Sequence, residues 1–160
     1  MAEDATFEEG GEQPLRLKAL DAEDLAVLSS LAQDAVFPAS EMQWDRKARR
    51  FGLLLNRFRW EDADRATARR RDLERVQSVL AIEDVTGVRS QGVPRGDKDV
   101  VLSLLSIAFE AGEDGTGVLH LTLAGDGIIA VSVEALEVLL KDVTRPYRAV
   151  SGQKPQHPQD

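Results

Sequence analysis

The first clear pattern in the chain is an alternation of apolar and basic positions over residues 15–20, whose period of two predicts a strand. Asp21 follows as a helix N-cap, with acidic residues in the first turn. Apolar residues then recur at helical spacing, at Leu25, Leu28, Ala32, Ala35 and Val36. Because Pro38 disfavours helical geometry in the residue before it, this predicted helix ends by Phe37.

The region 41–61 has the pattern of a β-hairpin. Two runs rich in apolar and β-forming residues, 42–45 and 51–60, flank the charged segment 46–50. If Asp45 pairs with Arg50, side-chain alternation places one set of residues on a common core-facing side. That set is Met42, Trp44, Phe51, Leu53 and Leu55.

The alternation in the second strand of this hairpin breaks after Leu55, because Arg57 and Arg59 would follow it into the core. One extra residue near Asn56 would return the aromatic residues beyond it to the core face and turn both arginines outward. We therefore predict a β-bulge or a sharp bend near Asn56. The alternative is a long coiled strand that leaves one hydrophobic core and enters another.

The middle of the chain alternates between charged and β-rich stretches. Residues 61–74 are strongly charged and predict an exposed connection or a solvated helical turn. Residues 75–93 are rich in Val, Ile and Thr and predict one or two strands. The apolar run 100–109 fits either a central strand or a buried helix. We choose a strand, because the glycine-rich segment 111–117 that follows is typical of a hairpin loop.

The C-terminal part predicts a second hairpin and a closing helix. Residues 118–124 and 127–133 are β-rich and meet at the compact turn Gly125-Asp126. Ser132 then caps a predicted helix over residues 133–143. The inner stripe of this helix consists of Leu136, Leu139, Leu140 and Val143.

These elements predict an α+β fold. Its antiparallel sheet of about seven or eight strands is strongly bent or forms a partly closed barrel, with the N-terminal-side helix and the C-terminal helix packed on it. A pleckstrin-homology-like barrel closed by the C-terminal helix is one candidate, by analogy. We expect a single domain over residues 14–146, a disordered acidic segment over residues 1–13, and a flexible Pro- and Gln-containing tail over residues 147–160.

Composition narrows the cellular setting. The formal net charge is −8, which disfavours nonspecific attraction to nucleic acid and to anionic membranes. The sequence has no cysteine, an acidic start unlike a signal peptide, and no apolar run of the roughly 20 residues that span a bilayer. We therefore expect a cytoplasmic protein with no membrane partner. Charge is nevertheless segregated, because eleven of the twenty Lys and Arg residues lie within residues 46–75.

Four segments carry a resemblance to a known family: LRLKALDAEDLAVLSS, RRFGLLLNRFRWE, RSQGV, and VEALEVLLKDV with the PQHP tail. In these segments the chain resembles a family of short alphaproteobacterial proteins, the domain of unknown function DUF2948. The resemblance covers roughly residues 15–158, and LLLNRFRWE is its most specific piece. It implies a bacterial, cytoplasmic, single-domain protein. It supplies no activity, substrate or catalytic residue.

A search for catalytic motifs predicts no catalytic, cofactor-binding or metal-binding residue. The two histidines, His120 and His157, lack a partner at metal-ligand spacing. The adjacent acids Glu83-Asp84 and Glu113-Asp114 are typical of turns and surfaces, because neighbours on a strand point to opposite faces. No serine stands in a nucleophile-elbow setting, and the glycines of residues 111–117 lack the lysine and the helix of a phosphate loop. We therefore expect a protein that is not an enzyme.

The candidate interaction surface is the arginine-rich hairpin, where cations are mixed with aromatic residues in a way that suits phosphate contacts and base stacking. Its residues are Arg46, Lys47, Arg49, Arg50, Asn56, Arg57, Arg59 and Trp60. The competing interpretation is that the tip only keeps a sheet edge soluble, while Arg57 and Arg59 pair with local acids such as Glu61. Trp44 and Trp60 are more often core residues than ligand platforms.

The function that we expect is that of a non-catalytic protein-interaction module. It would bind another cytoplasmic protein, or itself, through a sheet edge or through the surface of residues 57–60. The alternative is a binder of RNA, nucleotide or another anionic ligand through the arginine-rich hairpin of residues 46–60, which would show a steep dependence on salt.

Overall fold

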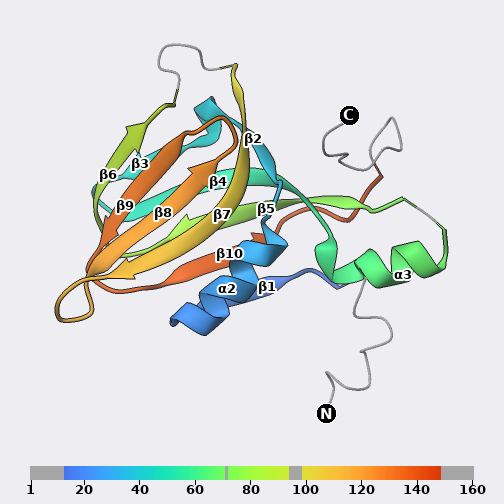
Figure 1. The fold of residues 1–160 in the computed structure, drawn as a ribbon, viewed down its shortest axis with the longest axis horizontal. Helices are drawn as coiled ribbons and strands as arrows, with labels where there is room; N and C mark the ends of the chain where they lie inside the picture. Colours follow the sequence, from blue (N-terminus) through green and yellow to red (C-terminus); the bar gives the residue numbers. More distant parts are fainter. Residues whose placement is uncertain (1–12, 71, 94–98, 149–160) are drawn as a thin grey trace.

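The computed structural model describes residues 13–70, 72–93 and 99–148, which form one antiparallel sheet with two short α-helices (Figure 1). The helices are α2 Ala22–Leu31 and α3 Ala63–Ala68, with single 3₁₀ turns at Ala39–Glu41 and Trp60–Asp62. The strands are β1 Arg16–Ala19, β2 Val36–Pro38, β3 Gln43–Asp45, β4 Arg50–Phe58, β5 Arg75–Ile82, β6 Val85–Gln91, β7 Val101–Ala111, β8 Gly117–Leu123, β9 Ile128–Val133 and β10 Val138–Asp142. The expected acidic segment up to residue 12, the expected tail from residue 149 and His157 lie outside the described residues.

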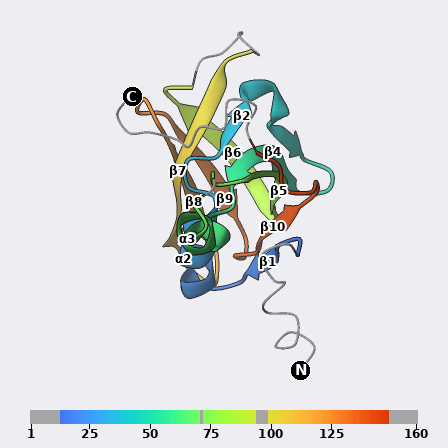
Figure 2. The same ribbon diagram turned by 90° about the vertical axis from the view of Figure 1, so that its right-hand side faces the viewer.

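The strands are hydrogen-bonded in the order β1-β10-β5-β4-β2-β7-β8-β9-β6, and β3 pairs with β4 beside this path. Figure 2 shows that the sheet bends, so that β7, β8 and β9 lie on one side and β5 and β10 on the other. The expected antiparallel α+β class is therefore confirmed. The expected count of seven or eight strands is wrong, because the described residues alone form ten.

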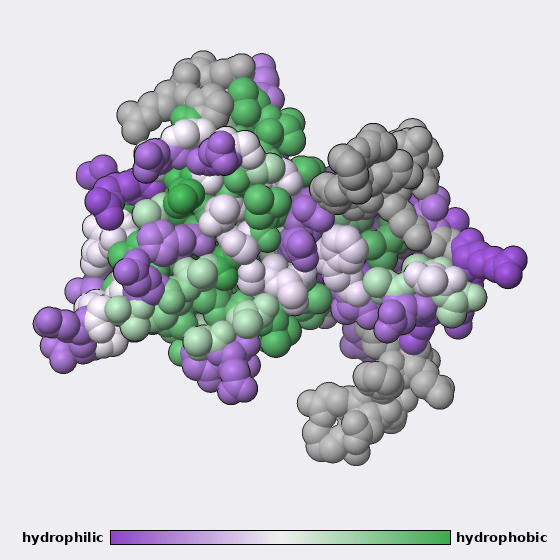
Figure 3. All heavy atoms as spheres, viewed as in Figure 1, coloured by the Kyte–Doolittle hydropathy of each residue, from purple (hydrophilic) through white to green (hydrophobic). Residues whose placement is uncertain are grey.

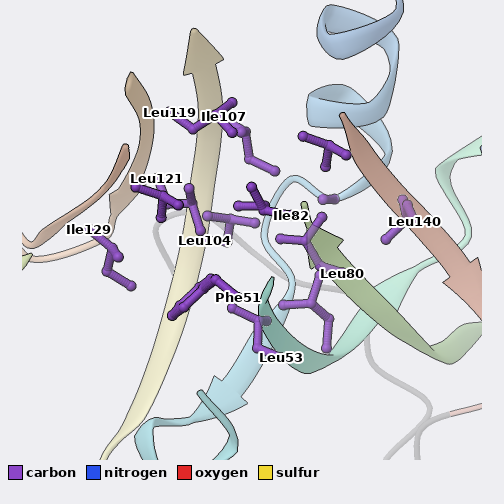
Figure 4. Packing of buried hydrophobic residues seen from close by; sticks show 14 of the residues in the cluster. Phe51, Leu53, Leu80, Ile82, Leu104, Ile107, Leu119, Leu121, Ile129 and Leu140 are labelled. Carbon is purple, nitrogen blue, oxygen red and sulfur yellow. The ribbon is translucent and has the colours of Figure 1, made fainter. Parts of the chain in front are cut away.

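The core fills the space between the two halves of the bent sheet. Phe51 and Leu53 of β4 face Leu104 of β7 and Leu121 of β8 across this space (Figure 4). Leucines of α2, Leu25 and Leu28 among them, belong to the same buried cluster. Asp21 caps α2 as expected, since its carboxylate accepts a hydrogen bond from the backbone N–H of Asp24 at 2.8 Å.

The helix α2 ends earlier than its apolar spacing predicts, at Leu31. Asp34 adopts a left-handed backbone conformation with φ 66°, and its N–H donates to the carbonyl of Leu104. The N–H of Leu104 donates in turn to the carbonyl of Ala35. These hydrogen bonds align the chain with β7 at the start of β2. Val36 is therefore a strand residue and not, as its spacing predicts, one of the apolar residues of the helix.

The expected C-terminal helix over residues 133–143 is wrong, because Val138–Asp142 form the strand β10 between β1 and β5. Val138, Leu140 and Asp142 are buried in alternation with Leu139 and Lys141, which is the period of a strand. The apolar residues of this segment also match helical spacing. The segment forms a strand because it pairs with β1 and β5 in the sheet. A helix there would leave the facing backbone groups of β1 and β5 without hydrogen-bond partners. The absent helix was also the basis of the pleckstrin-homology analogy.

The first hairpin has the expected register, with Asp45 opposite Arg50 and Trp44 opposite Phe51. The β-bulge or sharp bend expected near Asn56, which would turn Arg57 and Arg59 outward, is wrong. β4 pairs with β5 without a register shift from Phe51 to Phe58, and both arginines are buried. The alternative is confirmed: β4 leaves the main core and ends in a second cluster of Phe58, Ala66 and Leu73, against which Trp60 and Ala63 pack.

The remaining strand predictions agree with the structure. Residues 75–93 contain two strands, β5 and β6, and the apolar run 100–109 is the long strand β7. The hairpin of β8 and β9 turns at residues 124–127. Within the described ranges, no helix has the length and apolar character needed to cross a membrane.

Candidate functional site

The polar site begins where the inner face of β4, β5 and β10 stops being apolar. Ser78 of β5 lies opposite Asp142 of β10, and Arg57 is the inward residue that follows Leu55 on β4. Arg57 and Ser78 are 0% exposed and Asp142 is 7% exposed. Because the register of β4 does not shift, Arg57 stays on the core side and must be neutralised there.

Arg57 is held by two carboxylates and a hydroxyl. Its Nη1 and Nη2 donate to the two oxygens of Glu61, each at 2.9 Å, and Nη2 also donates to Oδ1 of Asp142 at 2.9 Å. Its Nε donates to Oγ of Ser78 at 3.0 Å, and that hydroxyl donates to Asp142 at 2.7 Å. Burial alone would lower the pKa of Arg57, but Glu61 and Asp142 outweigh it and raise the pKa above its ordinary value.

Arg59 is buried beside this network and is less completely bonded. It is 2% exposed, and its Nη1 donates to Oε1 of Glu74 at 2.6 Å and lies 3.6 Å from Oδ2 of Asp62. Its Nη2 is buried and has no hydrogen-bond partner among the described residues. A buried cationic donor without an acceptor is costly and uncommon in folded proteins. Arg59 therefore retains an unused donor.

Arg59 lines a cleft of about 550 Å³ between the end of β4, α3 and the segment after β10. The other lining residues are Pro14, Asp62, Arg65, Arg69, Glu74, Asp142, Thr144, Arg145, Pro146 and Arg148. Figure 3 shows hydrophilic residues gathered at this end of the molecule, around α3. Five arginines and three carboxylates thus share one concave surface.

The carboxylates of the cleft are already bound to guanidinium groups. Asp142 holds Arg57, Glu74 holds Arg59, and Asp62 lies within 3.8 Å of Arg65 as well as near Arg59. By contrast, three exposed arginines at the rim form no ion pair with another described residue. They are Arg69, Arg145 and Arg148. The cleft therefore has an excess of positive charge in a molecule whose net charge is −8.

The structure divides the expected interaction surface into three places. Four cations at the hairpin tip are exposed, namely Arg46, Lys47, Arg49 and Arg50. Asn56 and Trp60 are half-buried, and the indole N–H of Trp60 donates to the carbonyl of Gln33 at 2.8 Å. Arg57 and Arg59 are buried, so the expectation that they turn outward is wrong. The competing expectation that Arg57 pairs with Glu61 is confirmed.

The exposed cations at the hairpin tip also have neighbours. Arg49 forms an ion pair with Glu134, and Arg50 donates from Nε to Glu83 at 2.7 Å. Arg46 lies over the ring of Trp44, with its guanidinium carbon 5.9 Å from the ring centre. The tip and the cleft lie at opposite ends of β4, so the arginine-rich hairpin is not one surface.

The cleft contains residues that the sequence analysis did not select. Arg65, Arg69, Arg145 and Arg148 were missed, together with the carboxylate of Asp142. One signal was available: the failure of alternation at Arg57 already indicated a buried cation that needs buried acids. Nothing in the local pattern shows that its partner is Asp142, because the residues are 85 positions apart.

The described residues offer little for other chemistry. No group of three or more His, Cys, Asp or Glu side chains among them is arranged to hold a metal ion. His120 is half-buried on the outer face of β8, where its Nε2 lies 3.0 Å from Glu110. What the cleft offers chemically is a set of cationic hydrogen-bond donors.

Comparisons with known proteins agree with the resemblance seen in the sequence. A family model described as "Protein of unknown function (DUF2948)" matches residues 15–157, which include every residue of the cleft except Pro14. No curated protein and no solved structure matches the chain.

Proposed function

Because the chain belongs to the DUF2948 family of proteins of unknown function, we propose a function from its own geometry: the domain binds a small phosphate-bearing ligand in the arginine-lined cleft. The observation that carries the proposal is the presence of five arginines on one concave surface whose three carboxylates are already ion-paired. Guanidinium groups bind phosphate through paired, charge-assisted hydrogen bonds.

The size of the cleft favours a small molecule over a polymer. Its volume of about 550 Å³ lies within the roughly 300–1,000 Å³ of typical ligand sites. A nucleic acid strand would extend beyond the cleft onto the rest of the protein surface. Because the net charge of the protein is −8, that surface would repel an extended polyanion. Of the ligands that the sequence analysis left open, a nucleotide or another phosphorylated metabolite therefore fits better than RNA.

Arg59 and the rim arginines would act in sequence. The exposed side chains of Arg69, Arg145 and Arg148 would meet the anion first, since long surface side chains rearrange easily on binding. Nη2 of Arg59 is closed to solvent, so it would reach the ligand only after such a rearrangement. A phosphate oxygen would then supply the acceptor that this nitrogen lacks.

A binding role is favoured over a catalytic one. The carboxylates that line the cleft are engaged with Arg57, Arg59 and Arg65, and a general base needs a carboxylate that is free to take a proton from the substrate. The bonds that hold Arg57 and Arg59 order the inner part of the cleft before the ligand arrives, as in a recognition site, and only the rim arginines have to rearrange.

The test is calorimetric titration with sodium pyrophosphate at low and moderate salt. A charge-assisted hydrogen bond contributes about 1.5–3 kcal/mol, and about 1.4 kcal/mol is a factor of ten. The double variant Arg145→Glu with Arg148→Glu should therefore bind pyrophosphate roughly ten- to one-hundred-fold more weakly. Lys47→Glu is the control, because it reverses the charge of an exposed cation at the hairpin tip, at the other end of β4, with half the charge change of the double variant.

Two results would contradict the proposal. One is an unchanged affinity for pyrophosphate in the Arg145→Glu, Arg148→Glu variant while Lys47→Glu binds normally. The other is an equal loss in both, which would show only a general attraction of anions. Citrate serves as a second probe: tighter binding of citrate than of pyrophosphate would assign the cleft to carboxylates instead of phosphates.

A further inference from the structure

A second concave surface lies at the other end of β4, between the hairpin tip and β6. It encloses about 540 Å³ and is lined by Trp44, Arg46, Arg49, Val85, Thr86, Gly87, Val88, Arg89 and Ser132. We refer to these nine residues as the β6 groove. Figure 1 shows β3 and β6 at the same end of the molecule, away from α3.

One wall of the β6 groove is an unpaired strand edge. β6 is the last strand of the sheet and pairs only with β9 among the described strands. On its other side, the described residues make one backbone hydrogen bond, from the N–H of Val85 to the carbonyl of Arg49 at 2.9 Å. Alternate N–H and C=O groups of an edge strand point away from the sheet, so those beyond Val85 remain available to a further strand.

The edge of β6 carries little of the protection that exposed edges usually have. Such edges are normally protected by lysines, by proline, by β-bulges or by a covering element. β6 contains neither lysine nor proline, and its β-bulge lies at its start, between Val85 and Gly87. A Cβ atom added at Gly87 would meet no other atom within 4 Å, so the face of the strand is open there.

The charge of the β6 groove indicates the chemistry of its occupant. Among the described residues, its lining includes three arginines and no carboxylate. Arg49 is paired with Glu134, whereas Arg46 and Arg89 are exposed and form no ion pair with a described residue. Trp44 and Val88, both half-buried, supply apolar contact area in the same lining. An extended segment with acidic and apolar residues would match both the charges and the apolar contacts.

We propose that the β6 groove binds an extended acidic peptide segment of a partner protein, which adds to β6 as an additional strand. Main-chain hydrogen bonds would provide affinity, as in other strand-addition complexes, and Arg46 and Arg89 would select acidic side chains. This inference is independent of the proposed function of the cleft, because the two surfaces share no residue. It places the expected protein-interaction role at the β6 groove and gives strand addition as the way in which the partner binds.

The first test measures binding of a labelled octapeptide of alternating Glu and Val by fluorescence anisotropy. The same peptide N-methylated at every residue keeps its charges but loses the N–H donors of both strand edges. We expect the N-methylated peptide to bind at least tenfold more weakly. Equal affinity of the two peptides would overturn the proposal, because simple charge attraction does not need the backbone.

The second test locates the bound peptide by hydrogen exchange. Binding of the unmodified peptide should slow the exchange of the amides of residues 86–91, and the double variant Arg46→Glu with Arg89→Glu should bind at least tenfold more weakly. Arg16→Glu with Lys18→Glu is the matched control, since it makes the same charge change at two exposed cations of β1, the opposite edge of the sheet. Unchanged exchange in β6, or equal loss in the control, would overturn the proposal.

Discussion

In the first hairpin, one position that faces the core is occupied by an arginine, Arg57, instead of an apolar residue. Arg57 lies on the core side of β4 and is bonded at Nε, Nη1 and Nη2. Asp142 and Glu61 raise its pKa, so the charged form is stabilised by the fold and this contribution would be lost only as pH rises through that raised pKa. Arg57 is therefore cationic at every ordinary pH.

Removing this cation should be strongly destabilising. Arg57→Met keeps much of the side-chain volume but leaves Asp142 buried without its charge partner, which should lower the free energy of unfolding by about 3–5 kcal/mol. Urea denaturation measures this change. The double variant Arg57→Met with Asp142→Leu removes both charges and should be more stable than the single variant. A single variant as stable as the parent would show that the ion pair contributes little.

At the scale of elements, the hairpin of β7 and β8 depends on close approach at one glycine. A Cβ atom at Gly117 would lie 2.4 Å from ring carbons of Phe109 and 2.6 Å from the carbonyl oxygen of Glu110. Since a backbone atom cannot move aside cheaply, Gly117→Ala should lower the free energy of unfolding by about 1–3 kcal/mol. Gly87→Ala meets no atom and should change it by less than about 1 kcal/mol. Thermal or urea unfolding of both variants compares them directly, and equal stability would contradict this account of the hairpin.

The elements that the sequence predicted correctly are those whose pattern is local. The register of β3 and β4 follows from the alternation around Trp44 and Phe51, and α2 begins at the capping residue Asp21. The strand β10 was mistaken for a helix because its short apolar run satisfies both periods. Its partners, β1 and β5, are distant in sequence. Pairing with them makes this segment a strand, which its local pattern alone does not predict.

The candidate site was only partly predictable for the same reason. The sequence drew attention to Arg59 and its neighbours, because basic residues are concentrated within residues 46–75. The rim residues Arg145 and Arg148 follow β10 and reach the cleft only through the pairing of that strand with β5. Charge along the chain therefore shows where cations are concentrated, while the sheet order determines which arginines share the cleft.

At the scale of the whole molecule, β4 connects two concave basic surfaces on an acidic protein. Its first residues follow the hairpin tip beside the β6 groove, and its last residues enter the arginine-lined cleft. Between them the strand crosses the main core through Phe51, Leu53 and Leu55. On a protein with a net charge of −8, these are the two surfaces where we propose that anionic partners bind.

The central claim is that the cleft binds phosphate groups and that Arg59 joins the binding. The most direct measurement is heteronuclear NMR of the arginine side chains during titration with pyrophosphate, with Arg59 assigned by the loss of its signal in Arg59→Lys. We predict that the guanidinium signals of Arg59 and of the rim arginines shift together and saturate together. Saturable binding that leaves Arg59 unchanged, or shifts confined to Arg46 and Arg89, would contradict the account.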